Sequence, residues 1–364
     1  MRGFENEQHW DSHSDLMISA PQLLIEKAEA GHGLSRAEAE TFMEELLSGR
    51  VATPEIVRML LALNQRAVSV DELSGFARVM RQHAAPVFAQ DEPRPTGLVD
   101  TCGTGGDETG TFNISTASAI VAAAAGARVA KHGNRSVSSR SGSADVLEAL
   151  GANIDLPLAV AGRSVHEIGI GFLFAPAAHA AARHAMPARQ QIVKRTVFNL
   201  LGPLTNPAGA EAQVLGVFSA DVIDTVAATL AQLGTSRAFV VHGAGGLDEI
   251  SLSGETQIAE VRDGSVRRFI VAPEDFGVSR APLEAIRGGT PQENAKLIHS
   301  LLVGEPGPRL DIVIANAAAA LVVTGIAEDF RSAAELARRA VTSGEAQKKL
   351  EQLKDFAQRH AAPK

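Results

Sequence analysis

The chain has few aromatic side chains and a low share of basic ones, and both facts narrow its possible functions. Tyrosine is missing, tryptophan occurs once, and aromatic residues make up 4% of the 364 residues. Proteins that bind single-stranded nucleic acids stack the bases on aromatic rings and usually carry basic surfaces. Here 42 acidic residues outnumber 34 lysines and arginines, which gives a net charge of -8. We therefore expect no nucleic-acid partner.

Cysteine pairs and long hydrophobic runs are missing as well. Cys102 is the only cysteine, so an intrachain disulfide is impossible, and we expect a small buried residue there. The first residues lack the apolar core of a secretory signal. The longest apolar runs, such as 312–323, contain Asn316 and are too short to span a membrane. The sequence thus predicts a cytoplasmic protein without a membrane partner.

The N-terminal quarter has the pattern of a small helical domain. Residues 1–15 are polar and indicate a loose extension, whereas 16–90 contain clear helix starts. Ser35 and Ser69 each precede a glutamate by three residues, which is the capping-box pattern. We predict an all-helical domain over 16–90, joined by helices near 178–200. The charged, proline-rich segment 86–97 is expected to be a linker or hinge.

From Leu98 onward, strands and helices alternate, which predicts a large α/β domain over 98–364 with a mainly parallel central sheet. A helix is expected to begin at Thr290 and helical structure to continue to about Gln358. The other expected elements are strands over 212–218 and 237–242, a helix over 221–233, and a hairpin of 257–262 with 266–271 around Asp263-Gly264.

Two glycine-rich segments, 100–107 and 131–139, are separated by one helix-like stretch. Asn113 to Thr116 offer helix N-cap residues, and 117–125 is almost entirely made of helix formers. A right-handed strand-helix-strand unit brings both segments to the carboxyl edge of the sheet, where ligands of open α/β sheets bind.

The composition of these segments indicates a phosphate site. Gly103, Gly105 and Gly106 expose backbone amides, while Lys131 and its neighbours add charged and hydroxyl donors. The first segment has neither the dinucleotide-binding spacing nor the lysine of a P-loop, and glycine clusters also serve ordinary turns. Because the two segments are expected together, we favour a phosphorylated small molecule over a structural loop.

Asp248 and Glu249 follow the strand ending at His242 and a glycine turn, so two carboxylates are expected at the same edge. An exposed acidic turn is the alternative. Beside a phosphate site, paired carboxylates are what Mg²⁺ requires, since it takes one or two protein oxygens and keeps several waters.

Positive charge is concentrated before the loop 198–207. A solvated helix face or a carboxylate-binding arginine are the two interpretations. His132 could serve as a general acid or base or could simply pack within its loop. The basic residues are Arg183, His184, Arg189, Lys194 and Arg195.

At these residues the chain resembles the anthranilate phosphoribosyltransferases of tryptophan biosynthesis. The resemblance runs from about Leu23 to Leu353. It rests on several long motifs in the same order: 103–107, 111–116, 131–139, 141–145, 195–207 and 246–251.

The resemblance implies a reaction and a set of site residues. Phosphoribosyl pyrophosphate (PRPP) and anthranilate would give N-(5-phosphoribosyl)anthranilate and pyrophosphate, with Mg²⁺ as cofactor, in a homodimer paired through the helical domains. Ser115, Asp248 and Glu249 match the metal ligands, and Gly103, Asn134 and Arg189 match the anthranilate contacts. We take Lys131 and Asp107 as the catalytic residues. The donor-binding matches are Gly103, Gly106, Asp107, Thr111, Asn113, Ile114, Ser115, Thr116, Lys131, His132, Gly133, Asn134, Arg135, Ser136, Val137, Ser138, Ser139 and Ser143.

Three departures from the family pattern bear on acceptor handling and on dimer packing. They are Arg66 to Ser69, His179 to Arg183, and 192–196, where Val193 replaces a usual glycine. A paralogue acting on another aromatic amine, a pyrimidine nucleoside phosphorylase and a non-catalytic nucleic-acid-binding relative are the alternatives. The long signature of the phosphorylases is absent. The acidic pair and the negative net charge argue against a nucleic-acid-binding relative.

Overall fold

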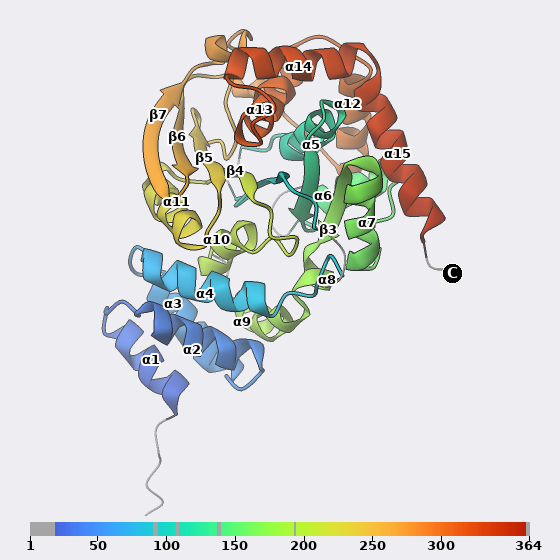
Figure 1. Ribbon diagram of the computed structural model, residues 1–364. Helices are drawn as coiled ribbons and strands as arrows, with labels where there is room; N and C mark the ends of the chain where they lie inside the picture. Colours follow the sequence, from blue (N-terminus) through green and yellow to red (C-terminus); the bar gives the residue numbers. More distant parts are fainter. Residues whose placement is uncertain (1–18, 90–93, 107–108, 137–139, 193, 362–364) are drawn as a thin grey trace, which may run out of the picture.

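The N-terminal part of the described chain is built from four helices (Figure 1). The computed structural model describes residues 19–89, 94–106, 109–136, 140–192 and 194–361. The predicted capping boxes are confirmed, because the Ser35 and Ser69 hydroxyls accept from the amides of Glu38 and Glu72 at 3.4 and 3.2 Å. The helices are α1 (Ala20–Glu29), α2 (Arg36–Leu47), α3 (Thr53–Leu63) and α4 (Val70–Gln82).

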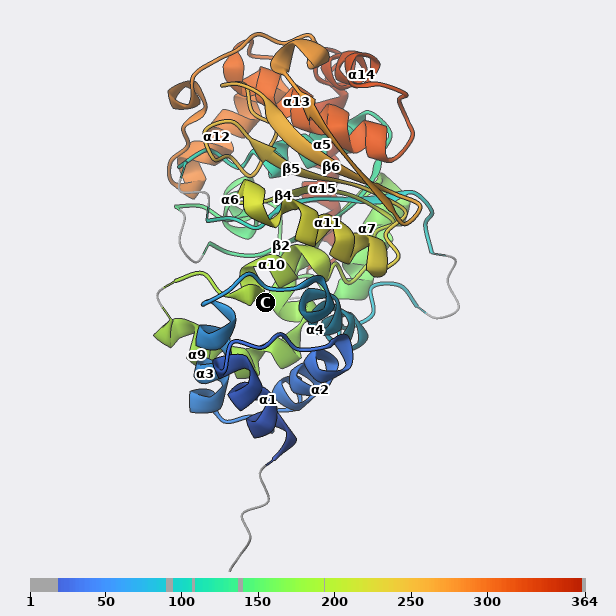
Figure 2. The same ribbon diagram turned by 90° about the vertical axis from the view of Figure 1, so that its left-hand side faces the viewer.

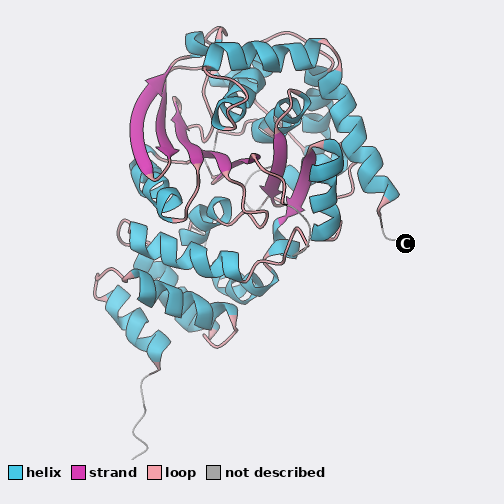
Figure 3. Ribbon diagram, in the orientation of Figure 1, coloured by secondary structure: helices cyan, strands magenta, loops and turns pink. Residues whose placement is uncertain are grey.

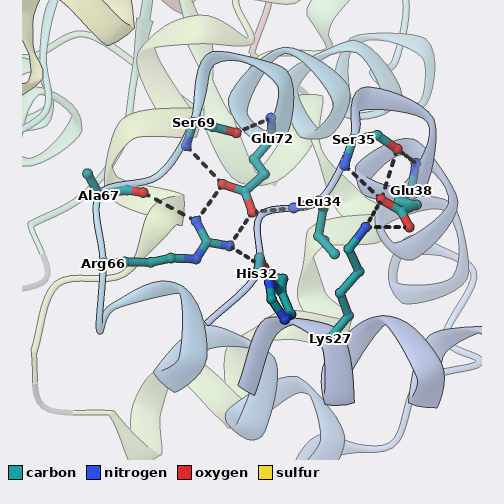
Figure 4. Close-up of polar contacts among 9 residues, drawn as sticks. All are labelled: Lys27, His32, Leu34, Ser35, Glu38, Arg66, Ala67, Ser69 and Glu72. Carbon is teal, nitrogen blue, oxygen red and sulfur yellow. Dashed lines mark hydrogen bonds and ion pairs between the residues drawn. The ribbon is translucent and has the colours of Figure 1, made fainter. Parts of the chain in front are cut away.

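A buried ion pair holds the connections of this helical part together (Figure 4). The fully buried Glu72 carboxylate accepts from both terminal nitrogens of Arg66, at 2.5 and 2.9 Å, and from the Leu34 and Ser69 amides. Arg66 also donates to the His32 carbonyl at 3.2 Å. Burial alone would raise the pKa of Glu72, but the bonds from Arg66 and the two amides outweigh it and lower that pKa.

Removing Arg66 should therefore destabilise the fold. In Arg66→Ala the Glu72 carboxylate stays buried without its cation, and we expect a loss of about 3 kcal/mol in the free energy of unfolding. Adding Glu72→Gln to that variant should recover part of the loss. Urea unfolding of both variants measures this, with Arg50→Ala, which breaks an exposed pair with Glu45, as the control that changes little. Equal midpoints for Arg66→Ala and the control would contradict the assignment.

The described residues form a seven-stranded sheet in the order β3-β2-β1-β4-β5-β6-β7 (Figure 3). The first five strands of that order run parallel, and β6 pairs antiparallel with both β5 and β7. The predicted mainly parallel sheet is thus confirmed. Asp263 and Gly264 both have left-handed backbones, at φ 48° and 78°, as the predicted hairpin turn requires. The strands are β1 (Leu98–Gly103), β2 (Arg128–Gly133), β3 (Ile170–Phe174), β4 (Ala212–Gly216), β5 (Arg237–Gly243), β6 (Thr256–Arg262) and β7 (Ser265–Val271).

Helices cover both faces of the sheet. On one face α5 and α13 pack on each other and on β1 and β4, and on the other face α11 packs on β5 and β6 (Figures 1 and 2). The remaining helical segments of this part are α5 (Ile114–Ala124), α6 (Ser143–Ala149), α7 (Leu158–Ile168), α8 (Ala175–Ala178), η1 (Ala180–Ala185), α9 (Met186–Gln191), α10 (Val197–Leu204), η2 (Ala220–Val222), α11 (Ile223–Gln232), η3 (Pro273–Phe276), η4 (Leu283–Ile286), α12 (Pro291–Leu302), α13 (Pro308–Val323), α14 (Phe330–Thr342) and α15 (Glu345–Arg359).

The C-terminal third is divided more finely than the sequence suggested. A helix does start at Pro291 with Thr290 as its cap, but turns at 303–307, 324–329 and 343–344 separate four helices before the chain reaches Arg359. None of the helices in the described part of the chain combines the length and apolar character needed to cross a membrane.

One apolar cluster extends from the helical part to the sheet. It joins the inner faces of α1 to α4 with α10, α11 and one face of β4, β5 and β6, and it includes Phe42, Phe76, Leu201, Leu230 and Val240. Helix α4 packs on both α10 and α11, while α9 and η1 pack on α3 and α2. Helices η1, α9 and α10 therefore lie against the helical part. The expectation of a loop over 198–207 is wrong up to Leu204, because Thr196 and Asn199 cap the helix α10, which runs from Val197 to Leu204.

Candidate active site

The two glycine-rich segments lie at the carboxyl ends of the neighbouring strands β1 and β2. After β1 the chain builds β2 and β3 outward on one side, and it then returns to place β4 on the other side of β1. The loop after β1 is thus at the topological switch point of the sheet, where a crevice opens in folds of this kind.

The acidic pair lies against the first glycine-rich segment. The Asp248 carboxylate accepts from the Gly105 amide at 2.8 Å, which corrects the expectation that this amide is open to a phosphate. A Cβ on Gly103 would overlap that carboxylate, and a Cβ on Gly216, at the end of β4, would overlap the Asp248 backbone carbonyl. The expected meeting of the acidic pair and the first segment at one edge is confirmed, and both carboxylates are half-buried.

Asn316 fixes the backbone beside the acidic pair. Its buried amide accepts from the Ile250 amide at 2.9 Å and donates to the Ile250 carbonyl at 3.0 Å. Sequence reasoning noted Asn316 only as an interruption of an apolar run. A single asparagine in an otherwise apolar buried helix was the available signal, because a buried amide requires polar partners.

Lys131 is buried under the site rather than exposed on its loop. Its ammonium donates to the Thr101 carbonyl and, at 3.3 Å, to the Ser115 hydroxyl. Asp100 lies nearby and is fully buried, and burial raises its pKa while the charge of Lys131 opposes that rise. The charge of Lys131 thus sits at the start of α5, between the two strands that carry the loops.

The start of α5 is tied to the C-terminal third. Thr111 pairs with Arg287, and the Asn113 side-chain oxygen accepts from Asn294 at 2.9 Å. Asn113 occupies the N-cap position, as predicted, although its side chain makes no capping bond. It donates to the Ser141 carbonyl instead. Ile114 and Thr116 are buried and can offer a ligand little besides their backbones.

The second glycine-rich segment folds back on α6. The Asn134 carbonyl accepts from the Ser143 hydroxyl, and a Cβ on Gly133 would overlap that hydroxyl. The Ser136 amide donates to Asp145 at 2.9 Å. Arg135 forms ion pairs with Asp145 and Glu148 at 3.1 and 2.5 Å, so in this structure its guanidinium faces acidic side chains of α6.

His132 is buried beside the ring of His179, with 5.2 Å between the ring centroids. Its backbone amide donates to Asp100 at 3.1 Å. Burial is the main cause that lowers the pKa of His132 to about 3, and the neighbouring His179 lowers it further. The ring is therefore neutral at physiological pH, which favours the packing interpretation of this residue over a general acid. Cys102 is partly buried, and burial raises the pKa of its thiol, in line with a small inert residue.

The buried His132 should make the protein sensitive to mild acid. Below about pH 6.5 a histidine in the unfolded chain binds a proton, whereas His132 in the folded protein stays neutral. As the pH falls, the free energy of unfolding should therefore decrease by up to about 1.4 kcal/mol per pH unit. In His132→Asn this decrease should be smaller between about pH 5 and pH 7. Chemical unfolding across that range measures it, with the exposed His299→Asn as a control that keeps the wild-type slope. Identical slopes for all three proteins would contradict the assignment.

The basic residues near 183–195 divide into different environments. Arg189 of α9 lies over the Phe198 ring, with its guanidinium carbon 5.1 Å from the centroid, and burial lowers its pKa. Among the described residues, no carboxylate lies within ion-pair distance of Arg189. Arg183, Lys194 and Arg195 are all exposed, and Arg195 also donates to the Gly106 carbonyl of the first glycine-rich segment.

Several expected site residues lie outside the described part of the chain. They are Asp107, Val137, Ser138, Ser139 and Val193, together with the expected extension over residues 1–15.

The fold and the arrangement at this edge define the class of protein. Residues 95–347 match the family model described as the a/b domain of a glycosyl transferase family, and residues 22–84 match the helical bundle domain of the same family. The helical part and the α/β part are thus the two domains of one glycosyl transferase architecture.

Relatives identify the branch of that family. The chain is 48% identical over 336 residues to the anthranilate phosphoribosyltransferase of Symbiobacterium thermophilum, covering 92% of this chain and 97% of the relative. It is 51% identical over 332 residues to that of Pelotomaculum thermopropionicum, covering 91% and 95%. The chain belongs to the anthranilate phosphoribosyltransferase family.

Solved structures agree with this assignment. The crystal structure of the Thermus thermophilus enzyme matches with a TM-score of 0.86 and 45% identity, covering 92% of this chain and 99% of that chain. The Saccharomyces cerevisiae enzyme, in complex with PRPP and Mg, matches with a TM-score of 0.84 and 25% identity, covering 93% and 98%.

Proposed function

We propose that the protein transfers the phosphoribosyl group of PRPP to the amine of anthranilate, giving N-(5-phosphoribosyl)anthranilate and pyrophosphate. The observation that carries this proposal is the meeting of two glycine-rich segments and an acidic pair at one switch point. Relatives over 45% identical along more than nine-tenths of the chain carry the name of that activity.

The donor would lie over the two loops. Backbone amides at the start of α5 offer hydrogen bonds to phosphate oxygens, and the charge of Lys131 lies beneath them. The exposed Asn134 and the hydroxyls of Ser136 and Ser143 border the second loop. We assign the donor site to these groups together.

The acidic pair suits a magnesium ion. No cluster of three or more metal-binding side chains occurs among the described residues, so a resident cation held by protein alone is not supported there. Two half-buried carboxylates beside a phosphate loop are instead what Mg²⁺ uses when substrate oxygens and waters complete its shell. Asp248 and Glu249, with the Ser115 hydroxyl, would hold it. Bound there, Mg²⁺ would neutralise charge on the pyrophosphate.

The chemistry demands little activation of the acceptor. The neutral amine of anthranilate forms the new bond to C1 of the ribose, the bond from C1 to the pyrophosphate oxygen breaks, and the amine loses one proton. Lys131 and the amides at the start of α5 stabilise the leaving charge, and the loops hold the donor in position. Closure of the helical part over the site would exclude water, which would otherwise hydrolyse PRPP.

Arg189 is the proposed partner of the anthranilate carboxylate. Its guanidinium is half-buried, supported by Phe198 and without an acidic partner among the described residues. A carboxylate ligand would supply that partner through two parallel hydrogen bonds. Gly103 and Asn134 would contact the rest of the acceptor.

We also propose a cytoplasmic homodimer paired through the helical domains. The exposed side chains of Leu23 on α1 and Leu61 on α3, 52% and 46% accessible, offer apolar surface for such a contact. The alternative is a paralogue whose acceptor is another aromatic amine. The assay below distinguishes anthranilate from such an acceptor.

Turnover should require both PRPP and Mg²⁺. Loss of anthranilate fluorescence in a mixture of protein, PRPP, Mg²⁺ and anthranilate measures the reaction. Asp248→Asn with Glu249→Gln should abolish turnover while the circular dichroism spectrum stays unchanged, because the two charges lie in a loop at the edge of the sheet. Normal turnover of this double variant at low Mg²⁺ would refute the metal assignment. If the wild-type protein does not consume anthranilate but consumes another aromatic amine, the acceptor assignment is wrong and only the assignment of phosphoribosyl transfer stands.

Arg189→Ala should raise the KM for anthranilate roughly tenfold or more, as expected when a charge-assisted hydrogen bond is lost. The KM for PRPP should barely change, and Arg183→Ala, which alters an exposed cation of the neighbouring η1, should change neither. Steady-state kinetics with each substrate varied in turn provide the measurement. Equal increases in both KM values would mean that Arg189 is structural and that another group binds the carboxylate.

A further inference from the structure

Three successive residues of the first glycine-rich segment are held by three different parts of the chain. Thr104 is joined to the end of β4, since its amide donates to the Gly216 carbonyl at 2.9 Å and its hydroxyl accepts from the Phe218 amide at 3.1 Å. Gly105 donates to Asp248. The Gly106 carbonyl accepts from the guanidinium of Arg195. The third contact comes from the segment between α9 and α10, on the side of the helical domain.

Arg195 is placed by groups of both domains. Its guanidinium carbon lies 4.6 Å from the centroid of the Phe218 ring, so the ring supports its plane. Its backbone carbonyl accepts from the Asn64 side chain, at the end of α3, at 2.8 Å. Gly106 leaves room for this approach, since a Cβ there would come within 2.8 Å of Arg195 Nε. Its φ of +75° also favours glycine.

We propose that Arg195 is a positioning residue for the donor loop, and that Asn64 acts through it to couple that loop to the helical domain. The inference rests on the proposed function and adds Arg195 and Asn64 to the residues that shape the donor site. A planar guanidinium held on an aromatic ring gives the Gly106 carbonyl one defined partner, which lysine cannot reproduce. With that carbonyl fixed beside the bonds of Thr104 and Gly105, the loop is already ordered when the donor binds, and the ordering cost on binding is avoided.

The role of Asn64 follows from its position. The α3–α4 connection that begins at Asn64 also contains Arg66, whose pair with the buried Glu72 fixes it. The amide of Asn64 therefore extends from an ordered turn of the helical domain to the backbone of Arg195. A displacement of the helical domain would pull on Arg195 and, through it, on the donor loop.

Donor binding tests the proposal directly. Isothermal calorimetry with PRPP and Mg²⁺ should give a Kd about tenfold higher for Arg195→Ala and an intermediate increase for Arg195→Lys. The KM for PRPP should follow, and the KM for anthranilate should stay near the wild-type value. Lys194→Ala, which removes the adjacent exposed cation, is the matched control and should bind PRPP normally. A Kd for Arg195→Ala equal to that of wild type would overturn the proposal, as would equal rises in both KM values.

The coupling through Asn64 has its own test. Asn64→Ala should weaken PRPP binding about threefold, a smaller effect than the loss of Arg195 itself, and should add nothing in the Arg195→Ala background. Additive effects of the two changes would refute the coupling, and the exposed neighbour Gln65→Ala serves as the control. If wild-type protein binds PRPP but does not consume anthranilate, the acceptor assignment fails while these binding comparisons still decide the role of Arg195. If wild-type protein does not bind PRPP, both proposals fail.

Discussion

The close approach of the acidic loop to the ends of β1 and β4 is the constraint on which the site depends. Asp248 lies where a side chain on Gly103 or Gly216 would have to be, so two strands must end in glycine for the acidic pair to reach the phosphate loop. The parallel register pairs Gly103 directly with Gly216 and brings both glycines under the same residue. The sheet thereby fixes the position of the carboxylates, although they lie in a loop.

Buried side-chain amides extend this order to the surrounding loops. Asn206 donates to the Ala130 carbonyl of β2 at 2.8 Å, Asn294 joins Gly289 to Asn113, and Asn316 holds Ile250. Gln213 of β4 donates to the Pro203 carbonyl at 2.6 Å. Asn294 and Asn316 satisfy backbone groups of Gly289 and Ile250, which lie outside the helices and strands, so these irregular segments are held without a ladder of backbone bonds.

The sequence predicted features that depend on neighbouring residues. The capping boxes at Ser35 and Ser69, the Asp263-Gly264 hairpin and the paired glycine segments all follow from local chemistry, and their strands and helices were confirmed. The side chain of Asn113, the burial of Lys131 and the anchoring of Ile250 by Asn316 depend on residues 28 or more positions away, and no local pattern encodes them. Arg66 belongs to both kinds: its departure from the family pattern was visible, but its pairing with a buried glutamate required the fold.

The apolar cluster shared by the helical part and the sheet limits how the two domains can be taken apart. The domains are separate in sequence, yet α4 covers surface on α10 and α11 that the sheet alone cannot bury. If the chain were cut between α4 and β1, both fragments would expose hydrophobic surface to solvent. Such surface promotes aggregation rather than independent folding. The helical domain is therefore a lobe of one folding unit, and insertions or fusions are better tolerated at the termini than at the junction.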